Sequence, residues 1–400
     1  MMDYSDKYLK YKNKYLQLKK LLDKQTGGTE PTDSFKLMTF NIEVLLNLFD
    51  WNATILTNST VNETRKNDFL ELFNNVDVLC LQECGIQTDT NQLKINLDNI
   101  KDLSKVADCT ASPLAWERSK FSYGDDSFLG NAIYVKENFI NTNQSAINIP
   151  LQYETEDSKE AEENKEIIIK KIKIPKVEKR CMAFYKLENN ITVASVHLFG
   201  GRFEDIRIIE YIMNGTFKDH KKEQLEKIIK INPDIICGDF NTKFRRGDIV
   251  KSTDIWKDSL ILQLVYQRIH NIDELRANEI IKKLKPEQKK DIINKYWDES
   301  KDSIWNNYIY MGYYDELLKK AGYKSIYESP NDIIDTTMFR GVVDFIYYKT
   351  AKLDIKTTPK IINIPKVMEQ TNNYDEETHL YKYTKILSDH FPVWVEFQKK

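Results

Sequence analysis

Short apolar segments that stop on an acid, an amide or a histidine are the feature that most limits how this chain folds. From residue 35 onward they alternate with helical or irregular stretches, and no internal repeat is visible. Short runs rich in β-branched residues and bounded by turn formers are typical of β-strands. We expect strands over Lys36–Asn41, Asp77–Gln82, Asn131–Val135, Ile167–Ile174, Ile191–Leu198, Asp234–Cys237, Val342–Tyr348 and Pro392–Phe397. The alternation predicts a fold that mixes helices and strands.

The polar residues in and directly after these segments are of types that can perform chemistry. They are Asn41, Glu43, Glu83, His197, Asp239, Asn241, Asp344, Asp389 and His390. Because strand ends let a rigid scaffold hold functional groups on loops, we expect these side chains to share one cleft. Carboxylate and amide oxygens suit Mg²⁺ or Mn²⁺, and no Cys/His set has zinc spacing. The mixture is typical of metal-assisted attack of water on a phosphate ester.

Each of these pieces has an ordinary structural explanation when it stands alone. An Asp-His pair usually lies on a surface, and Gly-Asp-x-Asn is most often a turn. Gln-Glu after a strand commonly caps or begins a helix. What points to a functional site is that all the pieces occur in one chain and in one order.

That order resembles the endonuclease/exonuclease/phosphatase superfamily, whose members are similar to deoxyribonuclease I. The matching pieces are TFNIE, LQE, GNAIYV, VHL, GDFN, VDFIYY and SDHFPV. They run from about Phe35 to Phe397 and are interrupted by two insertions. The resemblance implies a four-layer α/β/β/α sandwich of two mixed β-sheets, with one catalytic domain over residues 35–400.

The resemblance implies a metal site made of carboxylates. Glu83 matches the principal metal-ligating residue of the family, and Asp389 matches an acid that assists it. Glu43 stands where some members place a further metal-binding acid. The expected ion is Mg²⁺ or Mn²⁺.

The resemblance also implies catalytic roles. Asp239 matches the acid that orients or deprotonates the attacking water, and Asn241 matches the amide that holds the phosphate. His390 would contact the phosphate, with Asp344 holding its imidazole ring. His197 is similar to a second histidine found in the deoxyribonuclease and sphingomyelinase branches.

Four further residues are expected near the substrate. Asn41 matches an amide beside the metal and the scissile phosphate, and Arg180 resembles a basic residue of the family. Arg202 follows two glycines and would clamp a phosphate, or it is a surface arginine in a turn. Asn131 matches a position near the cleft, although local strand capping explains it too.

The leading hypothesis is a Mg²⁺-dependent phosphodiesterase, an endonuclease or exonuclease that acts on nucleic acid or on a nucleic-acid adduct. The alternative among enzymes is a phosphatase or phosphodiesterase for a small molecule or a lipid headgroup, similar to the sphingomyelinases. A catalytically inactive binding module on the same fold is a third hypothesis. The retained metal-binding and proton-transfer residues count against it, because a pure scaffold has no need of them.

Two further segments precede the catalytic domain, and two are inserted in it. Residues 1–24 carry Tyr and Leu in a heptad-like pattern, which predicts an amphipathic helix that docks on the domain or mediates self-association. Residues 25–34 are rich in turn formers and are expected to be a linker. Residues 154–166 are an acidic loop, and residues 243–330 are a helical insertion expected to shape specificity.

The charge balance limits the partners. A formal net charge of −2 excludes retention on nucleic acid by bulk positive charge, but a locally basic cleft stays open. Lys243, Arg245 and Arg246 follow the GDFN motif and are candidates to line such a cleft. No apolar run is long enough to span a membrane.

The number and spacing of the cysteines indicate the cellular compartment. The 5 cysteines include no Cys-x-x-Cys pair, so we expect reduced thiols in an intracellular, cytoplasmic protein. The Tyr- and Lys-rich first segment and the Lys/Asn/Ile/Tyr-rich usage resemble proteins of giant DNA viruses. That resemblance implies a location in a host cytoplasm or a virion.

Overall fold

The computed structural model places most of the predicted catalytic domain in two packed β-sheets. It describes residues 33–42, 63–87, 99–100, 102–113, 127–143, 147–151, 167–169, 172–174, 180–200, 208–209, 211–242, 259–272, 274–327, 336–337, 342–361, 368–375, 380–385 and 387–400. The predicted N-terminal helix, nearly all of the predicted linker and the acidic loop lie outside these ranges.

The first sheet has 8 strands in the order β14-β18-β1-β2-β5-β4-β3, with β15 also paired to β18. In chain order its strands are β1 (Ser34–Asn41), β2 (Val78–Gln87), β3 (Asn99–Ile100), β4 (Leu103–Pro113), β5 (Ser127–Lys136), β14 (Leu353–Ile355), β15 (Lys360–Ile361) and β18 (Val393–Lys399). Strands β1 and β2 run parallel, and the other pairs of the sheet are antiparallel.

The second sheet has 6 strands in the order β12-β13-β11-β10-β9-β6. Its strands are β6 (Ile147–Pro150), β9 (Cys181–Lys186), β10 (Thr192–His197), β11 (Ile235–Asp239), β12 (Tyr323–Ser325) and β13 (Asp344–Lys349). Here β10 and β11 are the parallel pair. Both sheets are therefore mixed, as the sequence predicted.

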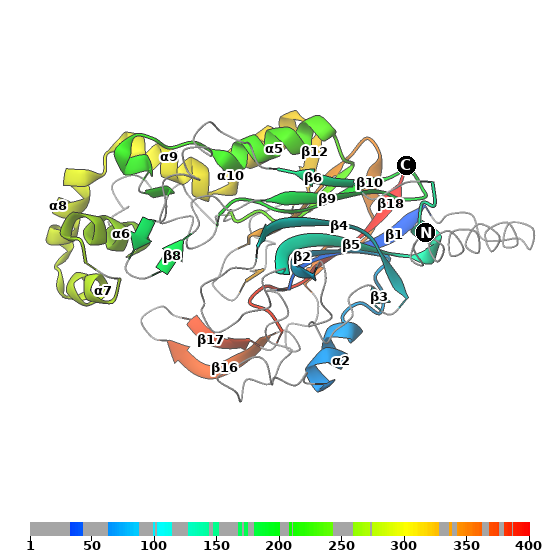
Figure 1. The fold of residues 1–400 in the computed structure, drawn as a ribbon, viewed down its shortest axis with the longest axis horizontal. Helices are drawn as coiled ribbons and strands as arrows, with labels where there is room; N and C mark the ends of the chain where they lie inside the picture. The colour runs from blue at the N-terminus through cyan, green and yellow to red at the C-terminus, as the bar shows by residue number, and fades with distance from the viewer. Residues whose placement is uncertain are drawn as a thin grey trace, which may run out of the picture.

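Alternating side chains on the strands separate the layers of the core. In β1, Leu37 belongs to the cluster between the two sheets, whereas Met38 belongs to a second cluster on the outer face. Phe69 of α2 (Glu63–Glu71) packs in that outer cluster. On the far face of the second sheet, Leu225 of α5 (His220–Ile231) and Tyr314 of α10 (Met311–Lys320) form a third cluster. This order of helix, sheet, sheet and helix confirms the predicted α/β/β/α sandwich (Figure 1).

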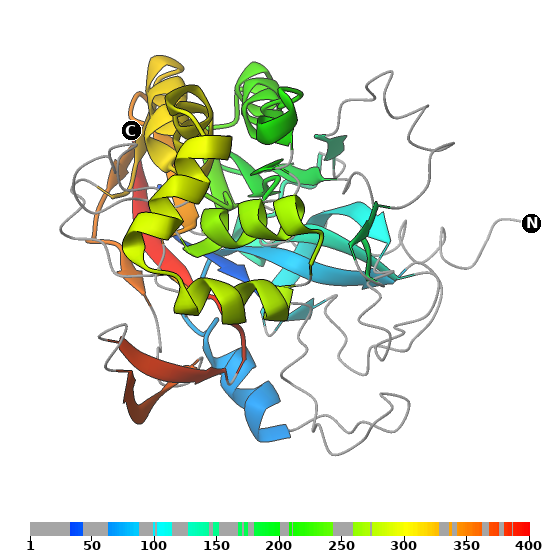
Figure 2. The same ribbon diagram turned by 90° about the vertical axis from the view of Figure 1, so that its left-hand side faces the viewer.

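The helical insertion contains α6 (Ser259–His270), α7 (Glu274–Lys283), α8 (Pro286–Tyr296) and α9 (Glu299–Ile309), followed by α10. Residues of α6 to α9 pack in a fourth hydrophobic cluster, which also includes Phe199 and Ile212 from outside the insertion. Figures 1 and 2 show α6, α7 and α8 gathered beyond one end of the sandwich. The chain returns to the second sheet at β12, so the helical part ends before the predicted boundary at 330.

Two small hairpins stand apart from the main sheets. The predicted single strand Ile167–Ile174 is two short strands, β7 (Ile167–Ile169) and β8 (Ile172–Ile174), which pair with each other. A run of β-branched residues predicts strand structure whether it forms one long strand or two short ones, so the composition did not reveal the turn between β7 and β8. The second hairpin pairs β16 (Met368–Asp375) with β17 (Leu380–Lys385).

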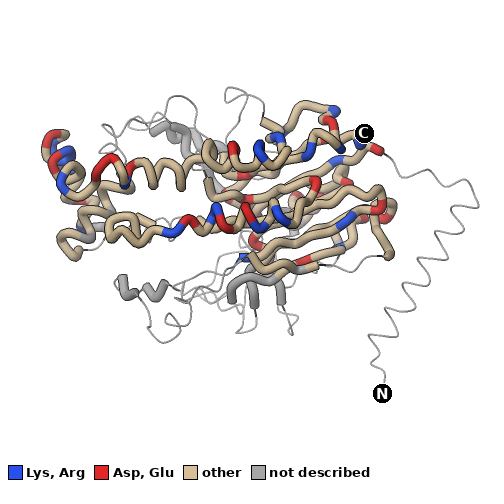
Figure 3. The backbone as a smooth tube through the Cα atoms, turned by 90° about the horizontal axis from the view of Figure 1, so that it is seen from above, with Lys and Arg blue, Asp and Glu red and all other residues tan. Residues whose placement is uncertain are grey.

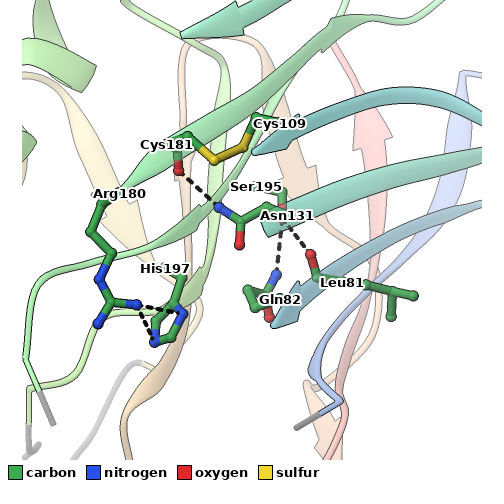
Figure 4. Close-up of a disulfide and its surroundings, with 8 residues drawn as sticks. All are labelled: Leu81, Gln82, Cys109, Asn131, Arg180, Cys181, Ser195 and His197. Carbon is green, nitrogen blue, oxygen red and sulfur yellow. Dashed lines mark hydrogen bonds between the residues drawn. A yellow bond between two sulfur atoms is a disulfide. The ribbon is translucent and has the colours of Figure 1, made fainter. Parts of the chain in front are cut away.

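A disulfide joins Cys109 of β4 to Cys181 of β9 and thereby links the two sheets (Figure 4). The expectation that all cysteines are reduced thiols is wrong for this pair. Its members are 72 residues apart and meet only because the sheets pack face to face, which no local spacing reveals. Cys80, Cys84 and Cys237 are buried free thiols.

The described surface carries charges of both signs. Figure 3 shows Lys and Arg interspersed with Asp and Glu along α5 and the helices of the insertion. Among the described residues, no helix has both the length and the apolar character that crossing a membrane requires.

Candidate active site

The candidate site lies where the two parallel strand pairs end, one pair in each sheet. Asn41 ends β1, while His197 and Asp239 end β10 and β11 and are paired in register. The Asn41 side-chain nitrogen donates to Glu83 Oε1 at 2.9 Å and to Asp239 Oδ2 at 3.1 Å. One buried amide therefore ties an acid of the first sheet to an acid of the second.

Glu83 occupies an irregular point of β2. The pairing of β2 with β5 shifts between Leu81 and Cys84, and Glu83 has a φ of 52°. A bulge turns a side chain away from the regular alternation of a strand, and such backbone strain clusters at functional sites. Burial raises the pKa of Glu83 to about 7, and the nearby charges of Asp389 and Asp239 act in the same direction.

The GDFN loop is held by its own glycine and asparagine. Gly238 has a φ of 140°, and a Cβ atom there would lie 1.9 Å from the Val196 carbonyl oxygen. Asn241 has a φ of 48°, and its backbone N–H donates to Asp239 Oδ1 at 2.7 Å. Its side-chain nitrogen donates to the Leu198 carbonyl at 3.0 Å. The loop therefore fixes one oxygen of Asp239, whose pKa is raised by burial to about 6.

His390 and Asp344 form a buried pair. Asp344 begins β13 opposite Asp239, and its Oδ2 lies 2.9 Å from His390 Nδ1. His390 Nε2 lies 3.7 Å from Asp239 Oδ2. Burial acts against the charged imidazole, but the carboxylates of Asp344, Asp239 and Asp389 outweigh it and raise the pKa of His390 well above its ordinary value. The raised pKa favours the charged imidazole, whose Nε2 faces Asp239.

The loop that carries His390 is held by hydroxyl groups. Ser388 Oγ donates to the Asn41 carbonyl at 2.8 Å and accepts from the His390 backbone N–H at 3.1 Å. Thr336 Oγ1 accepts from the Asp344 N–H at 3.2 Å, and the Thr336 carbonyl accepts from Phe391 N–H at 2.7 Å. Sequence patterns did not single out Ser388 or Thr336, because their role depends on loops meeting in space.

The surroundings of His197 favour its neutral form, in contrast to those of His390. Arg180 Nη1 lies 2.8 Å from His197 Nδ1 and 3.2 Å from His197 Nε2 (Figure 4), and Arg180 is always a donor. The shorter contact favours Nδ1 as the acceptor, with the proton of the neutral ring on Nε2. Burial is the main reason that the pKa of His197 is lowered, and the charges of Arg180 and His390 add to it. His197 Nε2 lies 3.5 Å from Asp239 Oδ2, on the proton-bearing side of the ring.

A buried polar network, which the sequence motifs did not indicate, underlies the site. Gln82 Nε2 donates to Ser195 Oγ at 3.0 Å, and Thr39 Oγ1 donates to Gln82 Oε1 at 3.2 Å. The Ser195 hydroxyl in turn donates to the Leu81 carbonyl at 3.3 Å (Figure 4). These contacts tie β2 to β10 across the sandwich. The sequence signal that could have indicated it is Gln82, an amide directly after the apolar run that ends at Leu81.

Most of the predicted site residues come together. The structure gathers Asn41, Glu83, Arg180, His197, Asp239, Asn241, Asp344, Asp389 and His390. Asn131 donates instead to the Cys181 carbonyl at 2.8 Å, so its described contact links the two sheets (Figure 4). Glu43, Arg202, Lys243, Arg245 and Arg246 lie outside the described residues.

The donor atoms fit a divalent cation held by oxygen. Ligand atoms of Glu83, His197 and Asp239 lie within 4.8 Å of one another, as do those of Asp239, Asp344 and His390. Both histidines have other partners, because His197 contacts Arg180 and His390 Nδ1 contacts Asp344. The remaining donors are carboxylates, which suit Mg²⁺ or Mn²⁺ better than zinc.

Comparisons with known proteins give similarity to solved structures only. No family model and no curated protein matches the chain. An AP endonuclease from Leishmania major is 13% identical, with 94% of this chain and 90% of that chain covered and a TM-score of 0.47. An endonuclease/exonuclease/phosphatase protein from Beutenbergia cavernae is 12% identical, covering 92% and 72%, with a TM-score of 0.45. The human Nocturnin catalytic domain is 14% identical, covering 92% and 96%, with a TM-score of 0.44.

Proposed function

We propose that this chain is a metal-dependent phosphodiesterase of the endonuclease/exonuclease/phosphatase type, which hydrolyses nucleic acid or a nucleic-acid adduct. The observation that carries the proposal is the position of Asp239 between two histidines of opposite charge preference. Its Oδ2 lies 3.5 Å from Nε2 of the neutral His197 and 3.7 Å from Nε2 of the cationic His390. An acid with a pKa near 6 that faces both a neutral and a charged imidazole is suited to moving a proton.

In the proposed reaction, Asp239 orients a water molecule and takes its proton. The water oxygen bonds to phosphorus as the ester bond breaks, and the leaving oxygen takes up a proton from solvent. Asn241 holds a phosphate oxygen, and the cationic His390 stabilises the negative charge that develops there. Asp344 keeps the His390 ring charged and fixed in orientation, since it binds Nδ1.

Glu83, with Asp389 and Glu43, would hold the metal ion. When bound, the ion supplies Lewis-acid stabilisation of charge on the phosphate oxygens. Asn41 places Glu83 and Asp239 a fixed distance apart, because a single amide nitrogen binds both.

The strained and buried polar groups favour an enzyme over an inactive binding module. Glu83 and Asn241 adopt left-handed backbone conformations, and Asp239 and Asp344 are carboxylates with almost no exposure. Strained backbone and buried carboxylates cluster at functional sites, and a scaffold that only binds a partner gains nothing from them. The basic residues Lys243, Arg245 and Arg246, which follow the GDFN motif, favour a nucleic-acid substrate.

The test is hydrolysis by the purified chain, with Mg²⁺, with Mn²⁺ and with a chelator. The substrates are plasmid DNA, an abasic-site duplex, single-stranded RNA, a 5′-tyrosyl oligonucleotide, sphingomyelin and a generic phosphodiester. Asp239→Asn is the inactive control, for which we expect a loss of about 10²–10⁴-fold in kcat at unchanged thermal stability. Asp354→Asn, at an exposed acid, is the matched control that should keep full activity.

Cleavage of any nucleic acid that needs the metal and is lost in Asp239→Asn would establish the proposal and name the branch. Activity restricted to sphingomyelin or to the generic ester would replace it with the small-molecule or lipid alternative. A chain that binds no divalent ion in calorimetry and hydrolyses nothing is an inactive binding module.

A further inference from the structure

Lys221 is a fully buried lysine that contacts the catalytic loop from behind. It is the second residue of α5, and its side chain is 0% exposed. Lysine is almost never fully buried unless its nitrogen finds partners, because an unsatisfied polar group costs free energy in the core. Here Nζ donates to the backbone carbonyl of Asn241 at 2.7 Å. Asn241, the residue proposed to hold the phosphate, is therefore bound to Lys221 through its backbone carbonyl.

The contact completes the fixation of Asn241. The Asn241 N–H donates to Asp239 and its side-chain nitrogen donates to the Leu198 carbonyl. With Lys221 on the carbonyl, the backbone N–H, the side chain and the carbonyl of Asn241 all have partners. A Cβ atom at Gly200 would lie 2.6 Å from Asn241 Cβ and 3.4 Å from Lys221 Nζ. The backbone of Gly200 therefore packs tightly against Asn241. Asn241 has a φ of 48°, a left-handed conformation that asparagine tolerates better than other non-glycine residues, and these contacts select it over the alternatives open to a free loop.

The same lysine contacts the helical insertion. Its Nζ lies 3.3 Å from the carbonyl of Tyr308 in α9 and 4.2 Å from the centroid of the Tyr308 ring. It also lies 5.6 Å from the centroid of the Tyr314 ring in α10. The Tyr314 hydroxyl donates to Asp219, the N-cap residue of α5, at 2.9 Å. Two helices of the insertion therefore fix both the start of α5 and the lysine beside it.

A second contact joins the insertion to the loop without passing through α5. Thr242 follows Asn241 and is fully buried, and its Oγ1 lies 3.1 Å from Sδ of Met311, the first residue of α10. The insertion thus contacts the loop at two consecutive residues.

We propose that Lys221 is a positioning residue, through which α9 and α10 set the place of Asn241 relative to Asp239. Lys221 contacts no reacting group itself. Its loss leaves the Asn241 carbonyl without this donor and lets the loop relax from its left-handed conformation. The insertion then serves the chemistry directly, besides any part it has in shaping specificity. The effect on turnover rests on the proposed function, whereas the effect on the loop does not.

The test compares Lys221→Met, which keeps the apolar stem and removes the donor, with Lys222→Met as the matched control. Lys222 is the next residue of α5, and its exposed side chain pairs with Glu226. The first readout is hydrogen exchange of the peptide that spans residues 238–242. We expect exchange to become faster by about tenfold or more in Lys221→Met and to stay unchanged in Lys222→Met.

The second readout is kinetics on whichever phosphodiester the wild-type chain cleaves. A misplaced positioning group costs up to about 10²-fold in rate, so kcat should fall by about 10- to 100-fold in Lys221→Met. The dissociation constant for Mn²⁺, measured by calorimetry, should stay the same, because the carboxylates are untouched. Lys221→Arg keeps a donor and should recover part of the lost turnover. A merely structural lysine would change thermal stability and leave kcat and loop exchange as they are.

A double-mutant cycle tests the link to the insertion. Tyr308→Leu removes the ring beneath Nζ, and the cycle with Lys221→Met measures whether the two residues act as one unit. We expect the effects on loop exchange and on kcat to be clearly less than additive. Equal exchange in Lys221→Met and Lys222→Met, or fully additive effects in the cycle, would overturn the proposal. If the wild-type chain hydrolyses nothing, the proposed function fails, and the exchange data still decide the role of Lys221.

Discussion

Arg180 Nη1 lies 2.8 Å from Nδ1 of His197, nearer than to Nε2 at 3.2 Å, so the guanidinium favours Nδ1 as the acceptor and adds to the effect of burial in favouring the neutral ring. The other histidine of the site, His390, has a carboxylate at the same ring position. The two imidazoles that face Asp239 are thus held in different states by partners of opposite charge. One can donate a neutral N–H, and the other can stabilise an anion.

The first prediction concerns this pair. Arg180→Met removes the donor, so the His197 ring is free to change tautomer and orientation. Loss of a group that orients a site residue typically costs about 10- to 100-fold in activity, and we expect a fall in kcat of that size. Nitrogen-15 NMR of the imidazole should show an unprotonated Nδ1 in the wild-type chain and a mixture of tautomers in the variant.

Arg276→Met is the control, because Arg276 lies on α7 and is exposed. It should leave both the kinetics and the His197 spectrum as they are. A protonated Nδ1 in the wild-type chain would contradict the assignment of the tautomer.

The second prediction concerns the metal-free chain and pH. The pKa of Glu83 is about 7 in the fold against an ordinary value of 4.5, so the folded state holds this proton more tightly than the unfolded state does. The contribution of Glu83 to stability is therefore fully present below about pH 4.5 and is lost as the pH rises through about 7. Glu83→Gln has no such proton. With a chelator present, we expect the variant to gain stability relative to wild type between these two pH values.

Urea unfolding across this pH range measures the effect. Glu226→Gln, at an exposed acid of α5, should run parallel to wild type. In calorimetry Glu83→Gln should bind Mn²⁺ at least about tenfold more weakly. Curves for Glu83→Gln and wild type that keep a constant separation at all pH values would contradict the raised pKa.

The third prediction compares two glycines. At Gly238 a Cβ would lie 1.9 Å from the Val196 carbonyl oxygen, in a backbone conformation with φ of 140°. The backbone of β10 has to move to admit it, so Gly238→Ala should destabilise the chain by more than about 3 kcal/mol. Gly312 lies in α10 with nothing within 4 Å of its Cβ position. Gly312→Ala should instead stabilise the chain by about 0.5–1 kcal/mol, since alanine favours helix. Denaturant unfolding of the two variants should give opposite signs.

The fourth prediction concerns the disulfide. A bridge between Cys109 and Cys181 closes a long loop and restricts the unfolded chain. Changing both residues to alanine should lower the free energy of unfolding by about 2–4 kcal/mol. A reductant should lower the stability of the wild-type chain and leave that of the double variant unchanged. Alkylation of all 5 cysteines in the denatured, unreduced chain would show that the bridge does not form.

The strands of the sandwich core could be predicted because they are buried on one or both faces. β1, for example, is mainly apolar and ends on Asn41 as predicted, although it begins at Ser34 and not at Lys36. Strand β4 of the same sheet was not predicted, since its sequence LSKVADCTASP mixes polar and small residues. Its pairing with β5 and its disulfide define it as a strand, and neither can be read from local sequence.

The site could be predicted as a set of residues but not as an arrangement. The motif order named Asp239, His197 and His390, while it left open that one imidazole is neutral and the other charged. That difference comes from Arg180 and Asp344, which reach the rings from separate strands and loops. Lys221 was passed over because a lysine in an amphipathic helix is normally exposed, and only the packed insertion shows that this one is buried.

The pairing of β1 with β18 has a consequence for when activity can begin. β18 lies beside β1 in the first sheet, and His390 is only three residues before β18 starts. A nascent chain that has left the ribosome as far as the insertion already carries Glu83 and Asp239, but it lacks His390 and the strand that pairs with β1. Under the proposed function, we therefore expect a partly synthesised chain to be inactive until Val393–Lys399 has been made and has paired with β1.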